Sequence, residues 1–307
     1  MSGTVSATLH MAGAWDVYPQ GGFKQTFRKA FKQALFFCYL YCGWIWVRDL
    51  VLGLIGRSHV VILYYHRVGW VDVLSKPSGA FRADMQYVGR NYQCLTLREL
   101  TELLQSGAPI RRKIAVVTFD DGYRDNYLAA FPELKRSGLR ATFFVTTGFI
   151  GTQKVFPHDA RALSNGTAAR EDWAKMTWDE LREMQKAGME IGSHTVDHAN
   201  MGQLDEQTVR GQAAESLGTL QRELGHQARS FCFPWGKRQD RGGSAPQILR
   251  EVGYYAAVTT EAGTVRRDDD LFQLRRIDLG NGHFTRLASF AAIEGLGCGW
   301  LARYLRR

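Results

Sequence analysis

Two polar clusters in the sequence carry residues that could bind one metal ion together. Asp120 and Asp121 lie in the run VTFDDG, and His194 and His198 stand four residues apart in the run GSHTVDH. Two imidazoles and one carboxylate suit a divalent transition metal that keeps open positions for water and substrate. Such a metal lowers the pKa of its bound water and polarises a carbonyl, so amide hydrolysis becomes feasible near neutral pH. We expect one carboxylate to bind the metal and the other to take the proton.

Neither cluster is specific when it is considered alone. An Asp-Asp-Gly sequence is more often a solvated turn, and a lone His-x-x-x-His is more often structural. Their position makes them specific, because each cluster directly follows an apolar run of the kind that forms a strand. His66 and Trp235 follow two further runs of this kind.

The elements that would position these residues alternate from residue 60 onward, with short β-branched and aromatic runs between amphipathic stretches. The predicted strands are 60–65, 114–119, 141–146, 189–193, 230–233, 255–259 and 274–277. The predicted helices are 81–90, 97–105, 126–137, 178–187, 205–224 and 245–252. Seven strands interleaved with helices indicate an α/β fold, either a parallel barrel or an open doubly wound sheet, with its chemistry at the carboxyl ends of the strands.

Through these motifs and three others, the chain resembles the polysaccharide deacetylase family, also called carbohydrate esterase family 4. The resemblance rests on Thr118-Phe119-Asp120-Asp121-Gly122, His194-Thr195-Val196-Asp197-His198 and Phe233-Pro234-Trp235-Gly236, with YHRV at 65–68 and ATFFV at 141–145 in support. It covers residues 58–284 and implies a distorted (β/α) barrel of about seven parallel strands. It also implies a metal-dependent deacetylase of N-acetylated amino sugars.

The resemblance implies a role for each matching residue. Asp120 would be the general base, and Asp121, His194 and His198 would hold the metal, most readily Zn²⁺, with Co²⁺, Ni²⁺ or Mn²⁺ as alternatives. The backbone N–H of Trp235 would bind the oxyanion, a contribution of ~3 kcal/mol to transition-state stabilisation.

Three further residues are expected to contact the substrate: Pro234, Tyr123 and Arg276.

The sequence departs from the family pattern at two places. Cys232 stands where many members have an arginine that orients the base, and the late Leu-x-His motif, whose histidine is the general acid, has no clean match in 274–279. Similar gaps occur in the branch of the family that acts on exopolysaccharides and lipid-linked sugars, which this chain resembles more. His66 and His283 are candidates for the acid, although either could be a structural histidine.

Two residues near these gaps have alternative interpretations. Arg276 could steady the base in place of the missing arginine, although a strand-end arginine is as often a surface salt-bridge partner. Cys232 has no sequence-adjacent base to activate it, which favours a small buried side chain over a reactive thiol.

The regions that flank the predicted catalytic domain have different compositions. Residues 1–22 are predicted to form a flexible tail, and residues 285–307 a basic amphipathic helix. Residues 23–57 carry a basic cluster and then 14 apolar residues, 34–47, before Arg48 and Asp49 interrupt the run. A spanning helix needs ~20 apolar residues, so this segment is better suited to lie in the membrane interface, with its aromatic residues at the head groups. The alternative is a helix docked on the protein's own core.

Charge and cysteine content bear on the partners and the compartment. The net charge of +9 indicates an anionic partner, but the basic residues are spread rather than striped, which argues against nucleic acid and leaves the membrane surface. The five cysteines are scattered and odd in number, as is typical of reduced thiols. With the short apolar run, they favour the cytoplasmic face of a bacterial inner membrane; the periplasmic face is the alternative, because the basic cluster precedes the run.

The functional hypothesis is therefore an N-deacetylase that acts on a membrane-presented glycan or a lipid-linked saccharide. One alternative keeps the site and changes the substrate, to a deformylase or esterase on a polyprenyl-linked sugar. Another is a degenerate family member that only binds glycan. The intact base and ligands count against the second alternative, because a pure binder has no use for them.

Overall fold

The structure is a computed structural model, which describes residues 23–55, 58–69, 75–157, 159–160, 173–225, 228–280 and 285–295. The predicted tail 1–22, His283, and the last part of the predicted C-terminal helix lie outside these ranges.

Seven parallel strands close into a barrel, which confirms the predicted fold class. Their bounds are β1 (Val60–Tyr65), β5 (Ile114–Phe119), β6 (Thr142–Val145), β7 (Glu190–Ser193), β8 (Ser230–Cys232), β9 (Ala256–Ala262) and β10 (Leu274–Asp278). Each strand pairs with the next in this order, and β1 pairs with both β5 and β10, which closes the ring. A short strand, β4 (Gln93–Leu95), pairs with the first half of β5. The carboxyl ends of the seven strands consequently meet at one rim of the barrel.

Successive side chains of each strand point alternately into the barrel interior and toward the surrounding helices. All six residues of β1 and of β5 are buried, as expected for parallel strands that are covered on both faces. Val61 and Leu63 pack in one apolar cluster while Val60 and Ile62 pack in another, because successive side chains point to opposite faces of a strand. The sequence shows near-continuous apolar runs here for this reason.

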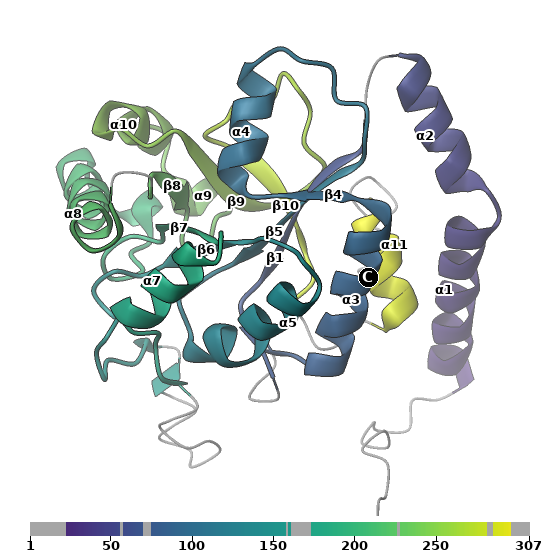
Figure 1. The fold of residues 1–307 in the computed structure, drawn as a ribbon, viewed down its shortest axis with the longest axis horizontal. Helices are drawn as coiled ribbons and strands as arrows, with labels where there is room; N and C mark the ends of the chain where they lie inside the picture. The colour runs from purple at the N-terminus through teal and green to yellow at the C-terminus, as the bar shows by residue number, and fades with distance from the viewer. Residues whose placement is uncertain are drawn as a thin grey trace, which may run out of the picture.

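Helices surround the barrel (Figure 1). They are α3 (Ser78–Asn91), α4 (Leu97–Gln105), α5 (Phe131–Arg136), α7 (Trp178–Lys186), α8 (Glu206–Leu224), α9 (Arg238–Arg241) and α10 (Ala245–Val252). Shorter elements are the π-helical turn η1 (Asn126–Ala130), the 3₁₀ turn η3 (Met201–Gln203) and a two-stranded pair of β2 (Arg67–Val68) with β3 (Ser75–Lys76). Thr96 and Thr177 each begin a helix with a reciprocal capping box, which fixes where α4 and α7 start.

The segment 23–57 forms two helices, not the single helix that the sequence predicted. They are α1 (Phe23–Tyr41) and α2 (Trp44–Leu54), and we call residues 23–55, which contain both helices, the N-terminal arm. Gly43 has φ 85° between them, a left-handed conformation that an α-helix does not contain. Within the described part of the chain no single helix has the length and apolar composition to cross a membrane, although the pair Gln33–Tyr41 and Trp44–Leu54, bent by 48°, passes that test together.

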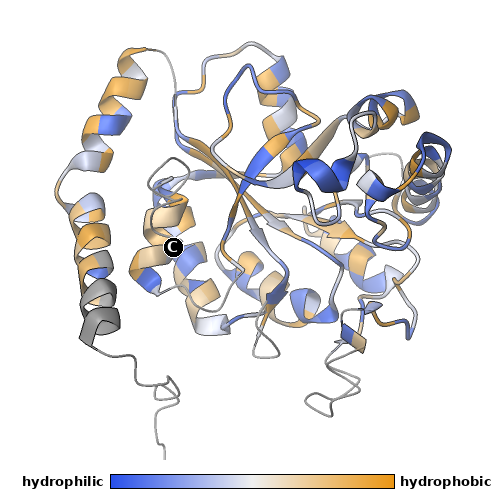
Figure 2. Cartoon of the chain, turned by 180° about the vertical axis from the view of Figure 1, so that it is seen from behind, coloured by the Kyte–Doolittle hydropathy of each residue, from blue (hydrophilic) through white to orange (hydrophobic). Residues whose placement is uncertain are grey.

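The arm runs along one side of the barrel, with α1 beside α11 (Arg286–Ile293) (Figure 1). No residue of α2 is buried, and ten of the twelve large hydrophobic residues that are exposed among the described residues belong to the arm. They are Phe31, Phe37, Tyr41, Trp44, Trp46, Val47, Leu50, Val51, Leu54 and Ile55. Figure 2 shows the arm as largely hydrophobic.

The arm is fixed to the barrel at one buried carboxylate, Glu294, just after α11. Arg48 of α2 donates to the Glu294 side chain at 2.7 Å and to its backbone oxygen at 2.6 Å. Lys113 and Tyr87 donate to Glu294 Oε1 at 2.5 and 2.9 Å. These side chains form what we call the Glu294 latch. Within the described residues, the helix predicted at 285–307 ends earlier than expected. Ile293 is the last residue of α11, Glu294 is its C-cap, and Gly295 follows with φ 79°.

Candidate active site

The base predicted from sequence, Asp120, lies at the end of β5 and is held by an arginine from another strand. Arg276 of β10 donates to both carboxylate oxygens of Asp120, at 2.8 and 2.7 Å. Both side chains are buried. Burial alone would raise the pKa of Asp120, but the Arg276 guanidinium and the neighbouring His194 and His66 outweigh it and hold that pKa below its usual value. Asp120 is therefore ionised and fixed in orientation.

Arg276 serves the base rather than the substrate, which corrects the prediction that it contacts substrate. Its other three N–H groups donate to the Thr259 carbonyl at 2.7 Å, to the Thr118 hydroxyl at 3.0 Å and to the Cys232 sulfur at 3.1 Å. All five donors of the guanidinium are thus occupied inside the barrel. The alternative that Arg276 steadies the base is the one that the contacts support.

Cys232 explains how an arginine from β10 reaches this position. It stands where many members of the resembled family have their arginine, and it is completely buried beside Asp120 and Arg276. Its small side chain leaves room for the guanidinium of Arg276. Burial raises the pKa of the Cys232 thiol, so the thiol stays protonated and is a buried packing residue, as the sequence favoured.

Asp121, His194 and His198 come together as the predicted metal set. Asp121 Oδ1 lies 3.3 Å from Nε2 of His194 and 3.3 Å from Nε2 of His198, and the three possible ligand atoms lie within 4.8 Å of one another. Asp121 Oδ1 is buried and accepts no hydrogen bond, a costly state for a carboxylate oxygen unless a cation is bound. The donor set therefore fits a divalent transition metal.

His194 is presented to a metal by its backbone contact. Its Nδ1 lies 2.8 Å from the Cys232 carbonyl oxygen. When Nδ1 donates its proton to that oxygen, Nε2 carries the lone pair that faces Asp121. Burial alone would lower the pKa of His194, but the Asp121 and Asp120 carboxylates beside the ring oppose it and hold that pKa above its usual value. Protons and metal therefore compete for this ring.

The backbone is bent sharply where the site residues lie. The described residues other than glycine with positive φ are Asp121 (75°), Thr195 (66°), His198 (63°) and Trp235 (62°). Such angles are uncommon outside glycine and cluster at functional sites. They turn the chain at the strand ends so that side chains from different strands converge.

Trp235 forms the exposed wall of the site. Its side chain is 52% exposed, and its ring lies 5.5 Å from that of His198. The Gly236 N–H donates to the Pro234 carbonyl at 2.6 Å across a γ-turn, and Trp235 O accepts from the Thr260 hydroxyl at 2.6 Å. The backbone of Trp235 is thus held in place next to the metal set. Pro234 is buried in this turn, and its contact with substrate stays a prediction.

His66 follows β1 and is partly exposed at the same rim. Its ring meets that of Tyr64 edge to face at 5.7 Å. His66 is also near enough to contribute to the lowered pKa of both Asp120 and Asp121. This position is compatible with the predicted general acid, whose role stays a prediction.

Tyr123 lies beneath the site and not in it, which corrects the prediction that it contacts substrate. Its side chain is completely buried, and its hydroxyl donates to Asp159 at 2.6 Å. Two cations lie over its ring, Arg67 at 4.4 Å and Lys175 at 3.7 Å. Lys175 also lies 4.2 Å from the centre of the Phe156 ring, which packs 5.1 Å from the ring of His198. Tyr123 therefore supports the loop that carries a metal ligand.

The support from Tyr123, Arg67 and Lys175 was not predicted from the sequence. Arg67 and Lys175 are cations and would be expected at the surface, and neither occurs at a spacing that suggests an aromatic partner. The YHRV run placed Arg67 near the rim, which is the one signal that could have been followed.

Comparison with known proteins agrees with the site. The family model for polysaccharide deacetylase matches residues 107–257. The polysaccharide deacetylase homologue YxkH of Bacillus subtilis (strain 168) is 30% identical over 222 residues, which are 72% of this chain and 71% of that protein. The chain belongs to the polysaccharide deacetylase family and is a hydrolase of that family, carbohydrate esterase family 4.

More distant relatives include two whose names state a substrate. The poly-β-1,6-N-acetyl-D-glucosamine N-deacetylase of Escherichia coli (strain K12) is 24% identical over 62% of this chain and 31% of its own length. The enzyme of that name from Staphylococcus aureus (strain MRSA252) is 23% identical over 63% of each chain. This chain thus spans about a third of the length of the Escherichia coli relative and under two thirds of the length of the Staphylococcus aureus relative.

Solved structures share the fold. The Streptococcus pyogenes deacetylase PplD matches with a TM-score of 0.64 at 23% identity, covering 77% of this chain and 98% of that one. IcaB from Ammonifex degensii matches with a TM-score of 0.61 at 23% identity, covering 78% and 97%. The barrel is therefore the fold of these deacetylases.

Proposed function

We propose that this protein is a metal-dependent N-deacetylase that hydrolyses the acetamide of an N-acetylated amino sugar in a membrane-presented glycan or lipid-linked saccharide. The observation that carries the proposal is the pairing of an ionised, oriented Asp120 with a three-ligand metal set beside it. Amide hydrolysis requires these two groups, because one takes a proton from water while the other stabilises the charge on the carbonyl oxygen.

In this proposal the chain's own residues divide the work. Asp121, His194 and His198 hold the metal, for which Zn²⁺ suits the ligand set, and the bound metal supplies Lewis-acid polarisation and a water of lowered pKa. Asp120 accepts the proton of the attacking water, and Arg276 keeps Asp120 aligned for that transfer. The N–H of Trp235 donates to the oxyanion. His66 delivers a proton to the leaving amine.

Two observations support a glycan substrate. The relatives from Escherichia coli and Staphylococcus aureus are named for a β-1,6-linked N-acetylglucosamine polymer. The exposed indole of Trp235 lies beside the metal set, where the apolar face of a sugar ring can stack on it.

The N-terminal arm supports presentation of the substrate at a membrane. Trp44, Trp46 and Leu54 are 63%, 69% and 78% exposed. Exposed apolar surface of this extent marks an interaction site, and Trp is enriched where membranes meet water. In this proposal the arm lies in the membrane interface at the cytoplasmic face of a bacterial inner membrane. Removal of residues 1–57 is expected to move the protein to the soluble fraction.

Acetate release tests the catalytic proposal. Metal-loaded protein is expected to release acetate from β-1,6-linked N-acetylglucosamine oligomers, and Asp120→Asn to lower the rate by roughly 10²–10⁴-fold, the usual contribution of a general base. Asp179→Asn is the matched control, because Asp179 is 93% exposed in its side chain and pairs only with Arg182 on α7. Release of formate, or cleavage of an ester in place of the amide, would support the alternative substrates. No release of any acyl group, with Asp120→Asn unchanged in cells, would support the glycan-binding alternative.

The membrane face is tested with the arm's own thiols. Cys38 and Cys42 are both exposed. With the arm at the cytoplasmic face, a membrane-impermeant maleimide is expected to leave both thiols unlabelled in intact spheroplasts and to label them after lysis. Labelling before lysis would place the protein on the periplasmic face.

A further inference from the structure

A cavity lies at the opposite end of the barrel from the metal set. Its volume is about 690 Å³, within the range of ~300–1,000 Å³ of ligand pockets. Val60 begins β1, and Ile110 precedes β5, so the cavity lies at the amino ends of the strands. Six residues of β1 separate it from the catalytic rim, roughly 20 Å at ~3.3 Å per residue. A ligand bound here would not reach Asp120.

Half of the twelve residues that line this cavity are apolar, and these six come from both the barrel and the arm. Leu104, Ile110, Val60 and Val265 line it from the barrel, and Leu52 and Ile55 line it from the arm. His59 also lines it, and burial lowers the pKa of His59 to about 4, so this ring is neutral at neutral pH. No Trp, Tyr or Phe is among the lining residues of the described chain, which counts against a sugar.

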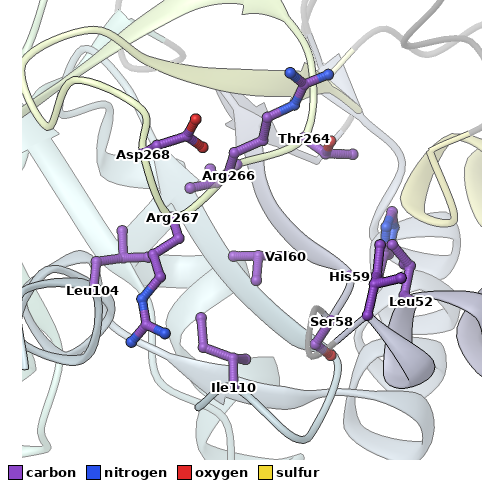
Figure 3. Close-up of a pocket in the computed structure, with 12 residues that line it drawn as sticks. Leu52, Ser58, His59, Val60, Leu104, Ile110, Thr264, Arg266, Arg267 and Asp268 are labelled. Carbon is purple, nitrogen blue, oxygen red and sulfur yellow. The ribbon is translucent and has the colours of Figure 1, made fainter. Parts of the chain in front are cut away.

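Cations lie at the edge of the apolar walls. Figure 3 shows Arg266 and Arg267 on the loop after β9, with their guanidinium groups on different sides of the cavity. Arg267 donates to the Ala108 carbonyl at 2.6 Å, and Arg266 is exposed. Asp268, also exposed on this loop, points away from Arg267 in the same view. Guanidinium groups are well suited to phosphate oxygens.

The arm wall of the cavity is part of the surface that we propose to meet the membrane. Ile55 lines the cavity and is 60% exposed, next to Leu54 at 78%. The Glu294 latch holds α2 against the barrel, and with it this wall. The cavity is thus continuous with the exposed apolar face of the arm, so an acyl chain could enter from the bilayer without crossing a polar surface.

We propose that this cavity binds one anionic phospholipid, with an acyl chain between α2 and the barrel and its phosphate at Arg266, because the Arg267 guanidinium lies on another side of the cavity and contacts Ala108. The inference rests on the membrane contact proposed above and is independent of the deacetylase activity. The lipid acts as an anchor and not as the substrate, because the metal set lies at the other end of the strands.

Photo-crosslinking distinguishes the cavity from the outer face of the arm. The full-length protein is incubated with phosphatidylcholine vesicles that contain phosphatidylglycerol with a diazirine on its acyl chain, and crosslinked peptides are mapped by mass spectrometry. We expect crosslinks in residues 104–110 as well as in the arm. Crosslinks confined to the arm would overturn the cavity site and leave the membrane contact intact.

Two pairs of variants test the walls and the charges separately. Ile110→Trp fills the cavity and is expected to abolish the crosslink in residues 104–110, whereas Leu128→Trp, at an exposed apolar residue of another surface, is expected to keep it. Arg266→Gln is expected to lower crosslinking at least fivefold (about 1 kcal/mol), whereas Arg222→Gln, on α8, is expected to have no effect. Equal crosslinking by a phosphatidylcholine analogue would overturn the assignment of an anionic head group.

Native mass spectrometry tests the site without a membrane. Short-chain phosphatidylglycerol below its micelle concentration is expected to bind as one molecule per chain, and Ile110→Trp to lose it. Failure to bind, together with the lack of the crosslink, would overturn the proposal. Acetate release from soluble oligomers is expected to be the same in all these variants, so that failure of the cavity site and failure of the deacetylase function remain distinguishable.

Discussion

The catalytic rim and the N-terminal arm differ in which groups they bury and which they expose. At the rim, charged groups are buried: Asp120 pairs with Arg276, and Asp121 faces two imidazoles together with which it could hold a cation. In the arm, large apolar groups are exposed, and charge ties the arm to the barrel through the Glu294 latch and an Asp49–Lys113 pair at 3.7 Å. A buried charge needs a partner within the protein, whereas an exposed apolar surface needs one outside it. The difference indicates a complete site at the rim and an incomplete surface at the arm.

Loss of one metal ligand should have the largest effect at the rim. We expect His194→Ala to lose both the metal and acetate release, because two remaining ligands do not make a catalytic site of this kind. Inductively coupled plasma mass spectrometry of the purified protein measures the metal. Asp197→Ala, an exposed residue of the same loop, is the control and should keep the metal. Metal retention by His194→Ala would contradict the ligand assignment.

The pH dependence of metal binding follows from the same ring. Metal binding needs a neutral His194, and the Asp121 and Asp120 carboxylates raise the pKa of this ring in the metal-free protein above its usual value, against the effect of burial. Metal affinity should therefore fall as pH drops below that raised pKa, and titrations at several pH values would show it. An affinity that does not change with pH would mean that Nε2 is not a ligand atom.

Arg276→Lys should have the next largest effect and leaves the metal set untouched. Lysine keeps the charge but not the two parallel bonds to Asp120, and misplacing a base costs ~10²-fold in rate. Asp120 must be ionised to act, so activity is lost as pH falls through its pKa. That pKa is lowered by Arg276, hence the acid limb of the pH profile should move to higher pH in the variant.

The neighbouring arginine gives the matched control for this test. Arg275 precedes Arg276 on β10, but it is 35% exposed and pairs with Asp269 outside the barrel. Arg275→Lys should leave both the rate and the pH profile unchanged. An unchanged acid limb in Arg276→Lys, with a rate loss alone, would show that the arginine only maintains structure.

The contrast between rim and arm also explains what the sequence could predict. The motifs at 118–122 and 194–198 are short and follow apolar strands, so a metal set with one further carboxylate could be predicted from type and spacing, whereas the division into Asp120 as base and Asp121 as ligand came from the family resemblance. The barrel followed from seven alternating runs, of which 60–65 and 114–119 have the bounds seen in the structure and the other five differ by one to three residues at one or both ends. The pairing of Arg276 with Asp120 joins residues 156 positions apart, which no local pattern reports.

The missed elements have local physical reasons. Strand β4 has only three residues, too few to show alternation, and it gains its stability from pairing with β5. The break of the arm at Gly43 was hidden within an apolar run, because composition does not reveal a left-handed residue. Tyr123 and Arg276 were expected at the substrate because they are polar and near the motifs, but burial is a property of the whole fold.

Lys175 offers a smaller test, on the support beneath the rim. Burial lowers the pKa of Lys175 to about 8, although Asp159 and Asp121 oppose this. Between about pH 8 and its unfolded value of ~10.4 the unfolded chain binds one more proton than the folded protein, so the free energy of unfolding should rise with pH, by at most ~3 kcal/mol. Denaturant titrations at several pH values give the free energy of unfolding of the wild type and of Lys175→Met. The difference between the two, plotted against pH, should isolate this slope. Lys154→Met, at an exposed lysine over Phe149, should retain the wild-type slope.

Glu294→Gln should have the smallest effect and should be confined to the arm. Glu294 forms salt bridges with Arg48 and Lys113. Burial alone would raise the pKa of Glu294, but the charges of these two residues outweigh it and lower that pKa. Because that pKa is lowered, the latch is fully formed above the unfolded value of ~4.3 and is lost only as pH falls through the folded value. Hydrogen exchange of α2, corrected for intrinsic rates, should therefore be slow from neutral pH down to about pH 5 in the wild type.

The glutamine variant should remove this protection at every pH, because it keeps the shape of the side chain and loses the charge that both cations contact. Charged hydrogen bonds contribute ~1.5–3 kcal/mol each, so exchange in α2 should be faster by a factor of at least about ten. Glu251→Gln, at an exposed pair with Arg210, should leave α2 unchanged. If exchange in the barrel rose together with that of α2, the arm would be part of the cooperative fold, and its apolar face would then be held for a partner by the protein's global stability and not by the latch.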